Sequence, residues 1–210
     1  MSNVSASLRQ YAAGLRVLLV LTVVLGVVYP LAVTGVGQLF FRSQANGSLV
    51  SSGGQVVGSR LIGQNFTDDK GNPLQEWFQS RPSAAGKDGY DPTASSASNL
   101  GPNSTDLVKA IEGRRAAAAE LDGVDASAVP PDALTASASG LDPDISPAYA
   151  YEQVARVAKA RGLDAAAVKA LVSSLVEGRG AGFLGEPTVN VLRLNLALDG
   201  SFGRPSAATQ

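Results

Sequence analysis

The chain has 210 residues, a formal net charge of −1, and neither cysteine nor histidine. The missing cysteines exclude disulfides, iron–sulfur clusters and thiolate zinc sites, and the missing histidines remove the commonest general base and transition-metal ligand. Because the charge is nearly balanced, no basic surface invites nucleic acid, and catalysis could rest only on serine–lysine pairs or paired carboxylates.

Residues 17–41 form an apolar segment without a single charged residue. A helix that rises about 1.5 Å per residue crosses the ~30 Å hydrocarbon core of a bilayer in about 20 residues. The segment is far longer than the ~7–15 apolar residues of a cleaved signal peptide, and no small-residue cleavage site follows it. We therefore expect an uncleaved membrane anchor from Val17 to Phe41, kinked at Pro30.

The charges on either side of this segment differ. Arg9 and Arg16 precede it with no acidic residue among them, whereas residues 43–59 contain no lysine or arginine. Positively charged flanks of membrane helices stay in the cytoplasm. We therefore predict a short cytoplasmic N-terminus, residues 1–16, and an extracytoplasmic domain, residues 43–210, on a single-pass protein of the bacterial cell membrane.

The domain begins with short Val, Leu and Ile runs separated by glycine and serine. Gly53-Gly54 between two such runs predicts a hairpin within residues 47–66, followed by a further strand. The stretch SSGGQ at the turn is similar to the nucleotide-contacting signature of ABC ATPases, but that signature needs a following helix, and strand-like residues follow here. In the loop-rich stretch that comes next, Trp77 and Phe78 are predicted to be local core anchors.

Two similar runs of small residues stand later in the chain, SASNLGPN at 96–103 and SASGLDPD at 137–144. Each ends in turn-forming residues and leads to a serine that can cap a helix, Ser104 or Ser146. Small side chains also let another backbone approach closely. We therefore predict a close contact at one or both runs, inside the domain or against a partner, with these candidate residues: Ser96, Ser98, Asn99, Ser137, Ser139 and Gly140.

The rest of the chain predicts helices and one strand. Helices are expected to start near Ser104, at Pro147 and after Asp164, and alternating apolar residues predict a strand over residues 188–198. The order of strands, helices and a last strand favours an α+β domain, with a small antiparallel sheet built from the 47–66 and 188–198 strands.

No constellation of residues predicts catalysis or metal binding. A serine hydrolase with Lys87 or Lys109 as its base is the enzymatic alternative, but the chain contains no S-x-x-K motif. We predict no catalytic residue and no metal ligand, and leave open a stand-alone anchored sensor or binding module.

With these residues in view, the sequence resembles the C-subunit (KdpC) family of the Kdp potassium-transporting ATPases over nearly the whole chain. The resemblance rests on several motifs in one order, namely YPLAVTGVGQLFF, QANGSLV, GSRLIGQNF, FQSRPSA, YDPTASSASNLGP, LTASASGLDPDISP, RVAKARGL and NVLRLNLALD. Their shared order behind an N-terminal anchor makes the resemblance specific.

The resemblance implies a non-catalytic subunit of a high-affinity potassium importer. In that family's complex a channel-like subunit (KdpA) conducts the ion, a P-type ATPase subunit (KdpB) hydrolyses ATP, and a small single-helix peptide (KdpF) is present. The C subunit is needed for assembly and is described as a catalytic chaperone that raises the ATP affinity of KdpB in a transient ternary complex. No tightly bound cofactor is implied. Since the predicted topology separates the domain from cytoplasmic ATP, an effect through the membrane helix and the partner subunits agrees better with this sequence.

Overall fold

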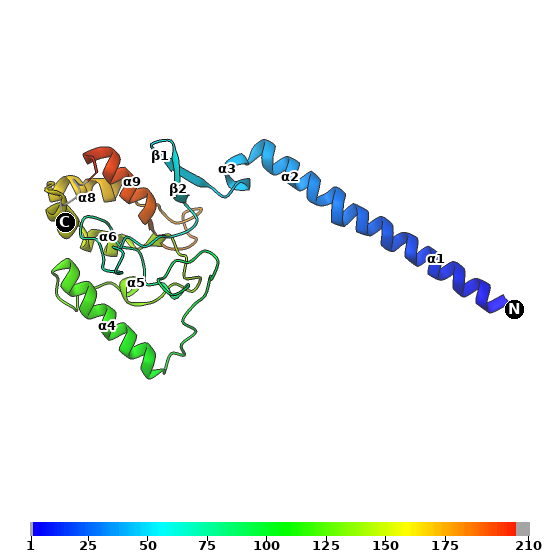
Figure 1. The fold of residues 1–210 in the computed structure, drawn as a ribbon, viewed down its shortest axis with the longest axis horizontal. Coiled ribbons are helices and arrows are strands. Elements are labelled where there is room, and N and C mark those ends of the chain that lie inside the picture. Colours follow the sequence, from blue (N-terminus) through cyan, green and yellow to red (C-terminus); the bar gives the residue numbers. More distant parts are fainter. Residues whose placement is uncertain (1, 205–210) are drawn as a thin grey trace. The chain divides into compact units, whose positions relative to one another are not determined.

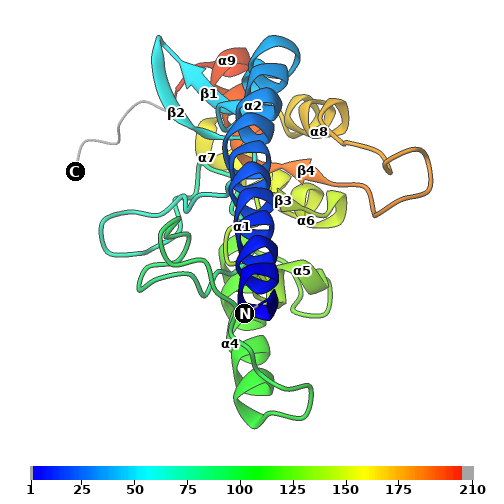
Figure 2. The same ribbon diagram turned by 90° about the vertical axis from the view of Figure 1, so that its right-hand side faces the viewer.

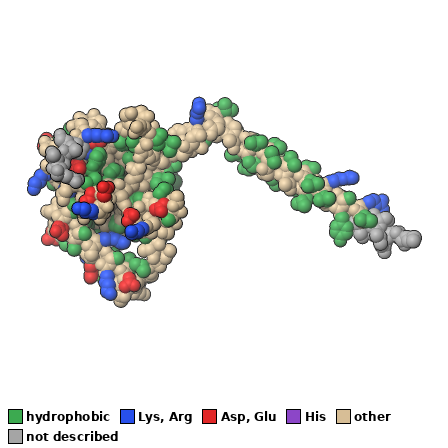
Figure 3. Space-filling view, in the orientation of Figure 1, with side chains coloured by type: hydrophobic (Ala, Val, Ile, Leu, Met, Phe, Trp, Pro, Cys, Tyr) green, Lys and Arg blue, Asp and Glu red, His purple; other side chains and the backbone are tan. Residues whose placement is uncertain are grey.

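The structure, a computed structural model, describes residues 2–204, with side chains from Leu8 onward. The chain divides into two compact units, Met1–Leu49 and Val50–Gln210, whose elements are drawn in Figure 1 and Figure 2. Hydrophobic side chains cover the long helix of the first unit, whereas charged side chains gather on the second (Figure 3). The first unit thus has the surface of a membrane segment and the second that of a domain in water.

The first unit is a long apolar helix followed by one short helical turn. Helix α1 (Ser2–Val23), the π-helical turn η1 (Val24–Val28) and α2 (Tyr29–Phe40) run on from one another, and α3 (Arg42–Ala45) follows. The part from Leu8 to Phe40 has 33 residues and is long and apolar enough to cross a membrane. It contains most of the segment in which the sequence predicts an anchor.

Pro30 is accommodated by a wider helical turn rather than by a break in the helix. Proline has no amide hydrogen, so one carbonyl in the preceding turn loses its backbone partner. In η1 the chain takes π-helical spacing, and the amide of Tyr29 donates to the carbonyl of Val24. The disturbance predicted at Pro30 therefore takes the form of a π bulge.

The turn that follows α2 is tied to the helix by the side-chain amides of Gln38 and Asn46, which we call the amide clasp. Phe41 leaves helical geometry with φ −133°. The two side-chain amides then exchange hydrogen bonds of 3.1 and 3.3 Å. A Cβ added at Gly37 would lie 3.6 Å from the Cβ of Ala45. The C-terminal end of the apolar helix is thus held by the turn that follows it.

The second unit, with the strand that leads into it, combines helices with two small pairs of strands. Its elements are β1 (Leu49–Ser52), β2 (Gln55–Ser59), α4 (Thr105–Asp122), α5 (Pro131–Leu134), β3 (Asp144–Ile145), α6 (Pro147–Glu152), α7 (Val154–Arg161), α8 (Ala165–Ser174), β4 (Val189–Asn190) and α9 (Val191–Phe202). β1 pairs with β2, and β3 pairs antiparallel with β4, Asp144 opposite Asn190 and Ile145 opposite Val189. The predicted α+β class is confirmed, but the 47–66 hairpin and the strand at residues 189–190 lie in two separate sheets and not in the single sheet that the sequence predicts.

The three predicted helix starts are confirmed by their capping bonds. The hydroxyl of Ser104 accepts the amide of Asp106 at 3.2 Å, and the hydroxyl of Ser146 accepts an amide of α6 at 3.0 Å. The carboxylate of Asp164 accepts the amide of Ala166 at 3.2 Å at the start of α8. Each bond satisfies one of the amides that a helix leaves unpaired in its first turn.

The predicted hairpin forms, but the strand predicted after it is wrong. Gly53 and Gly54 hold the turn with φ of 58° and 82°, and positive values at both positions match the twist of hairpin strands. Residues 60–66 are turn and loop instead of a strand. There the amide of Gly63 donates to the carbonyl of Leu141 at 2.9 Å, so a distant loop takes the bond that a strand neighbour would have taken.

The strand predicted over residues 188–198 is also wrong, because α9 begins directly after the two residues of β4. The side-chain oxygen of Asn190 accepts the amide of Arg193 at 3.1 Å and so caps the helix. The buried residues of α9 follow helical spacing, and they are Val191, Leu192, Leu194, Asn195 and Leu198. Leu192 interrupts the alternation because it belongs to this helical face.

The core of the second unit lies among α6, α7, α8 and α9. Phe78 enters it from a loop and is completely buried, as predicted. Its neighbour Trp77 stacks on Phe66 at 5.9 Å between ring centroids and lies under the guanidinium of Arg161 at 4.5 Å. The completely buried aliphatic side chains around Phe78 are Val157, Val168, Val172, Val189, Leu194 and Leu198. Burial of each such side chain stabilises the fold by about 1.5–3 kcal/mol.

Candidate functional site

Two buried side-chain amides hold the loop that carries Phe78. Asn195 of α9 accepts the amide of Phe78 and donates to its carbonyl, both at 3.0 Å. Gln153, between α6 and α7, accepts the amide of Gln79 at 2.6 Å and donates to its carbonyl at 3.2 Å. The two side chains thus replace a neighbouring strand, and a segment without regular structure keeps its backbone bonds satisfied inside the core.

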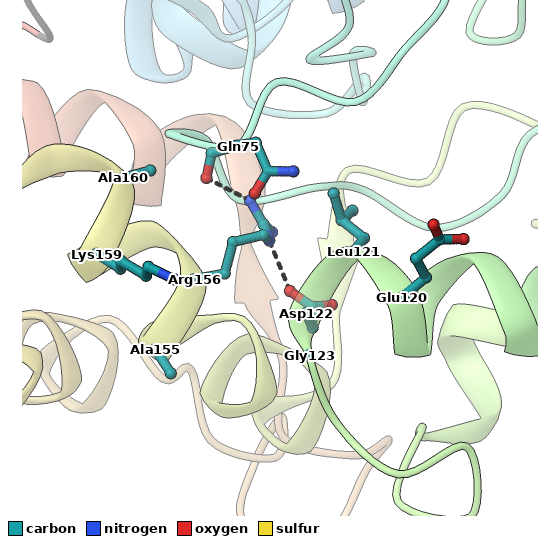
Figure 4. Close-up of a pocket in the computed structure, with 9 residues that line it drawn as sticks. All are labelled: Gln75, Glu120, Leu121, Asp122, Gly123, Ala155, Arg156, Lys159 and Ala160. Atoms are coloured by element: carbon teal, nitrogen blue, oxygen red, sulfur yellow. Dashed lines mark hydrogen bonds and ion pairs between the residues drawn. The ribbon is translucent and has the colours of Figure 1, made fainter.

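Arg156 of α7 joins three segments at one edge of this core. Its Nε donates to Asp122 at 2.6 Å, its Nη1 to the carbonyl of Gln75 at 2.6 Å, and its Nη2 to Gln153 at 2.7 Å. The Arg156 and Asp122 side chains are 3% and 0% exposed. A pocket opens beside the pair (Figure 4), lined by Gln75, Glu120, Leu121, Asp122, Gly123, Ala155, Arg156, Lys159 and Ala160. The guanidinium already donates to Asp122, Gln75 and Gln153, so few of its N–H groups remain to bind an anion in that pocket.

Three carboxylates in this region influence one another electrostatically, and they are Glu152, Asp122 of the ion pair, and Asp132. Burial, and then the charges of Asp122 and Asp132, raise the pKa of Glu152 to about 7. Burial also raises the pKa of Asp122, although Arg156 opposes it. One oxygen each of Glu152 and Asp122 is buried without a hydrogen-bond partner, whereas Asp132 accepts two bonds from Ser146. Glu152 is therefore the group in this region that changes its protonation near neutral pH.

Gly140 of the second small-residue run lies against Ser96, the first residue of the first run, in what we call the small-residue junction, residues 83–85, 95–96 and 139–140. Gly140 has φ +69°, and a Cβ added there would lie 2.6 Å from both the Cβ of Ala85 and the carbonyl oxygen of Ser96. The hydroxyl of Ser95 donates to the carbonyl of Ser139 at 2.9 Å. Backbones approach here at a distance that excludes a larger side chain at Gly140.

Further polar contacts fix the junction to its surroundings. The hydroxyl of Ser83 donates to the carbonyl of Gly140 at 2.6 Å and accepts the amide of Tyr90 at 2.9 Å. Tyr90 is buried and donates its hydroxyl to the carbonyl of Arg81 at 2.8 Å. Arg81 forms an ion pair of 2.8 Å with Asp142, which is part of the second run. The junction is therefore a cross-linked corner and not a loose loop.

The predicted candidates fall into two groups. Ser96, Ser139 and Gly140 meet in the junction, and buried Ser137 supports it, since its hydroxyl accepts the amide of Gly140 at 3.1 Å. Two other candidates of the first run, Ser98 and Asn99, are exposed, and the structure does not bring them into the junction. Whether this corner also faces a partner stays a prediction.

The structure gives the enzymatic alternative no support. Lys87 and Lys109, the two bases considered for a hydrolase, are both exposed. Among the residues that the structure describes, no group of three acidic side chains is placed to hold a metal ion. The buried amides of Gln153 and Asn195 bond the backbone of Phe78 and Gln79, and the sequence analysis did not predict them. Gln153 and Asn195 could have been found as polar residues at apolar positions of helical patterns.

Comparison with known proteins identifies the family. A family model described as "KdpC: K+-transporting ATPase, c chain" matches residues 11–200. The potassium-transporting ATPase KdpC subunit of Kineococcus radiotolerans is 63% identical over 191 residues, which cover 91% of this chain and 93% of that protein. Proteins of the same name from Mycobacterium tuberculosis (strain H37Rv) and Polynucleobacter asymbioticus are 53% and 49% identical, over 91% and 93% of this chain and 98% and 99% of their own lengths. The chain therefore belongs to the KdpC family of K+-transporting ATPase c chains.

Proposed function

We propose that this chain is a non-catalytic, accessory subunit of an ATP-driven potassium importer. The observation that carries the proposal is the family match over residues 11–200. The long apolar helix from Leu8 to Phe40 agrees with a subunit of a membrane complex. The absence of histidine and cysteine from the sequence also fits a chain that leaves the chemistry to another subunit.

The proposed partners are those of the Kdp complex. KdpA conducts potassium, KdpB hydrolyses ATP, and KdpF is a small single-helix peptide. The role of this chain in that assembly is to stabilise it, and a domain with its own hydrophobic core next to a long apolar helix suits that role. Neither a tightly bound cofactor nor nucleic acid is part of the proposal.

The proposal places residues 43–210 outside the cell membrane and residues 1–16 in the cytoplasm. It is supported by Arg9 and Arg16 before the apolar segment and by the lack of basic residues directly after Arg42. With this topology, any increase in the ATP affinity of KdpB passes through the membrane helix and the partner subunits. Direct contact with ATP in a ternary complex is the other form of the chaperone role.

The test is affinity purification from the native membrane in mild detergent with a tag at the C-terminus. The expected result is co-purification of the channel-like and ATPase subunits, and loss of potassium-stimulated ATPase activity from membranes in which this chain is deleted. A chain that purifies alone, folds and is dispensable for the ATPase would instead be the anchored sensor or binding module.

A further inference from the structure

Residues 177–188, between α8 and β4, form a closed hairpin, which we call the 177–188 hairpin. Glu177 and Thr188 exchange backbone hydrogen bonds of 2.8 and 3.0 Å at its base, and Gly180 and Leu184 exchange two bonds of 2.8 Å near its tip. Figure 2 shows this segment extending away from the neighbouring elements of the second unit. The loop thus has a shape fixed by its own bonds, and its residues 177–186 are exposed.

The tip of this hairpin displays two large apolar side chains to solvent. Phe183 is 72% exposed and Leu184 is 60% exposed. A Cβ added at Gly182 or Gly185 would meet nothing within 4 Å, so the backbone beside the two side chains is bare as well. Neither side chain belongs to the hydrophobic core cluster of the described residues. Adjacent exposed apolar side chains on a small projecting element are typical of a contact with another molecule.

The charge of the hairpin distinguishes between possible partners. It carries two carboxylates, Glu177 and Glu186, and one guanidinium, Arg179, and Arg179 pairs with Glu186 at 2.7 Å across the strands. Glu177 is paired in turn with Arg193 of α9. Each charged side chain of the hairpin is therefore in an ion pair, while insertion into an anionic lipid surface is favoured by unpaired lysine and arginine. A neutral apolar pocket on a protein complements this tip better.

The fixed shape points to the same kind of partner. Side chains that enter a lipid interface need no defined geometry. An element that is ordered before it binds a protein pocket loses less conformational entropy and therefore binds more tightly. The two pairs of backbone bonds and the cross-strand ion pair supply that order.

We propose that the 177–188 hairpin is a docking element that inserts Phe183 and Leu184 into an apolar pocket on another protein subunit of the transporter. The inference rests on the proposed function, since it takes the partner to be a subunit of the same complex. The rim of the contact is the Arg179–Glu186 pair, which lies beside the tip.

The natural absence of cysteine makes the test direct, because one introduced cysteine is a unique label in this chain. Phe183→Cys is compared with Val56→Cys, at a position on β2 that is 61% exposed. Maleimide labelling of this chain is measured for the full-length protein alone in detergent and for the purified complex. We expect the cysteine at 183 to be labelled in the isolated chain and protected in the complex, and the cysteine at 56 to be labelled in both.

Three outcomes contradict the inference in different ways. A recovered complex in which the cysteine at 183 still labels overturns the docking element alone. Protection of that cysteine in phosphatidylcholine–phosphatidylglycerol vesicles holding only this chain assigns the tip to lipid and also overturns it. A wild-type chain that recovers no other subunit overturns the proposed function, and the inference with it.

A second pair of variants measures the strength of the contact. Phe183→Ser with Leu184→Ser removes the apolar tip, and Val56→Ser with Leu61→Ser removes two side chains of matched exposure, 61% and 58%. We expect the first pair to lower the recovery of partner subunits roughly tenfold or more, as for truncated hot-spot residues, and the second pair to leave it unchanged. Thermal midpoints should match wild type for both. Wild-type assembly by the tip variant would refute the proposal.

Discussion

At the scale of single residues, the fold depends on polar side chains buried where the sequence pattern has apolar ones. Asn195 and Gln153 together satisfy both backbone groups of two successive residues, Phe78 and Gln79. A buried group that loses its partner costs about 1–3 kcal/mol, so these amides matter more through what they satisfy than through their own burial.

Replacement of Asn195 by leucine keeps the number and branching of the side-chain heavy atoms but leaves the amide and the carbonyl of Phe78 without partners. We expect Asn195→Leu to lower the free energy of unfolding by roughly 2–5 kcal/mol, measured by urea unfolding of the full chain in detergent. Asn103→Leu, at an exposed position, serves as the control. Equal urea midpoints for the two variants would show that the side-chain bonds to Phe78 carry no net stability.

Glu152 makes stability depend on pH near neutrality. Its pKa of about 7 in the folded chain lies above the 4.5 of an ordinary glutamate, so the folded state binds the proton more tightly than the unfolded chain. The resulting stability is fully present below pH 4.5 and is lost as the pH rises through about 7. We expect Glu152→Gln to flatten the decline in thermal midpoint between these values.

The control for this prediction is Glu112→Gln, which neutralises an exposed carboxylate on α4. The quantity to compare is the difference between variant and wild type across the pH series, since Asp122 and Asp144 also have raised pKa values. If Glu112→Gln and Glu152→Gln change the pH profile alike, the buried position of Glu152 is not the cause.

At the scale of elements, helix starts were predictable because a cap is a local signal. Ser104, Ser146 and Asp164 each act on the first turn that follows them, so a few residues contain all the information. The run after Asn190 was misread because its leucines fit a strand and a helix almost equally well. The deciding signals were a capping residue at Asn190 and an apolar residue at Leu192 that breaks the alternation, and both were visible in the sequence.

Other features could not be predicted because their partners are distant in the chain. The pairing of Asn195 with Phe78 spans 117 positions, and no local period encodes it. Similarly, the two small-residue runs suggested a close contact, but only the fold shows that Gly140 meets Ser96 and Ala85. The small residue types predicted a close backbone contact, but which segments meet in it is determined by the tertiary structure.

The small-residue junction gives an element-scale prediction with an internal control. Gly140 and Gly123 have nearly the same φ, +69° and +68°, but a Cβ meets neighbours at 2.6 Å only at Gly140 and nothing within 4 Å at Gly123. Gly140→Ala should therefore destabilise the chain by about 1–3 kcal/mol more than Gly123→Ala, which measures the cost of the positive φ alone. Equal losses in urea unfolding would remove the case for close packing at this corner.

At the scale of the whole molecule, the chain joins a membrane helix to a domain in water. If residues 43–210 lie outside the cell, protease added to intact spheroplasts should digest the domain and leave an N-terminal tag protected. If the anchor is retained, mass spectrometry of the purified chain should find the N-terminus before Val17. A new N-terminus beyond Ala32 would show that the helix is cleaved. A domain protected from protease would show that the topology is the reverse.

The amide clasp of Gln38 and Asn46 has a consequence for the way the helix fits its bilayer. The uncharged stretch from Val17 to Phe40 is about 36 Å long as a helix, longer than the ~30 Å hydrocarbon layer. A helix with a free end could shorten by fraying its last turn, but here the hydrogen bonds of the amide clasp hold that turn in place. The hydrophobic mismatch must then be absorbed by tilt or by local thickening of the membrane, so the helix should stand more upright in a thicker bilayer.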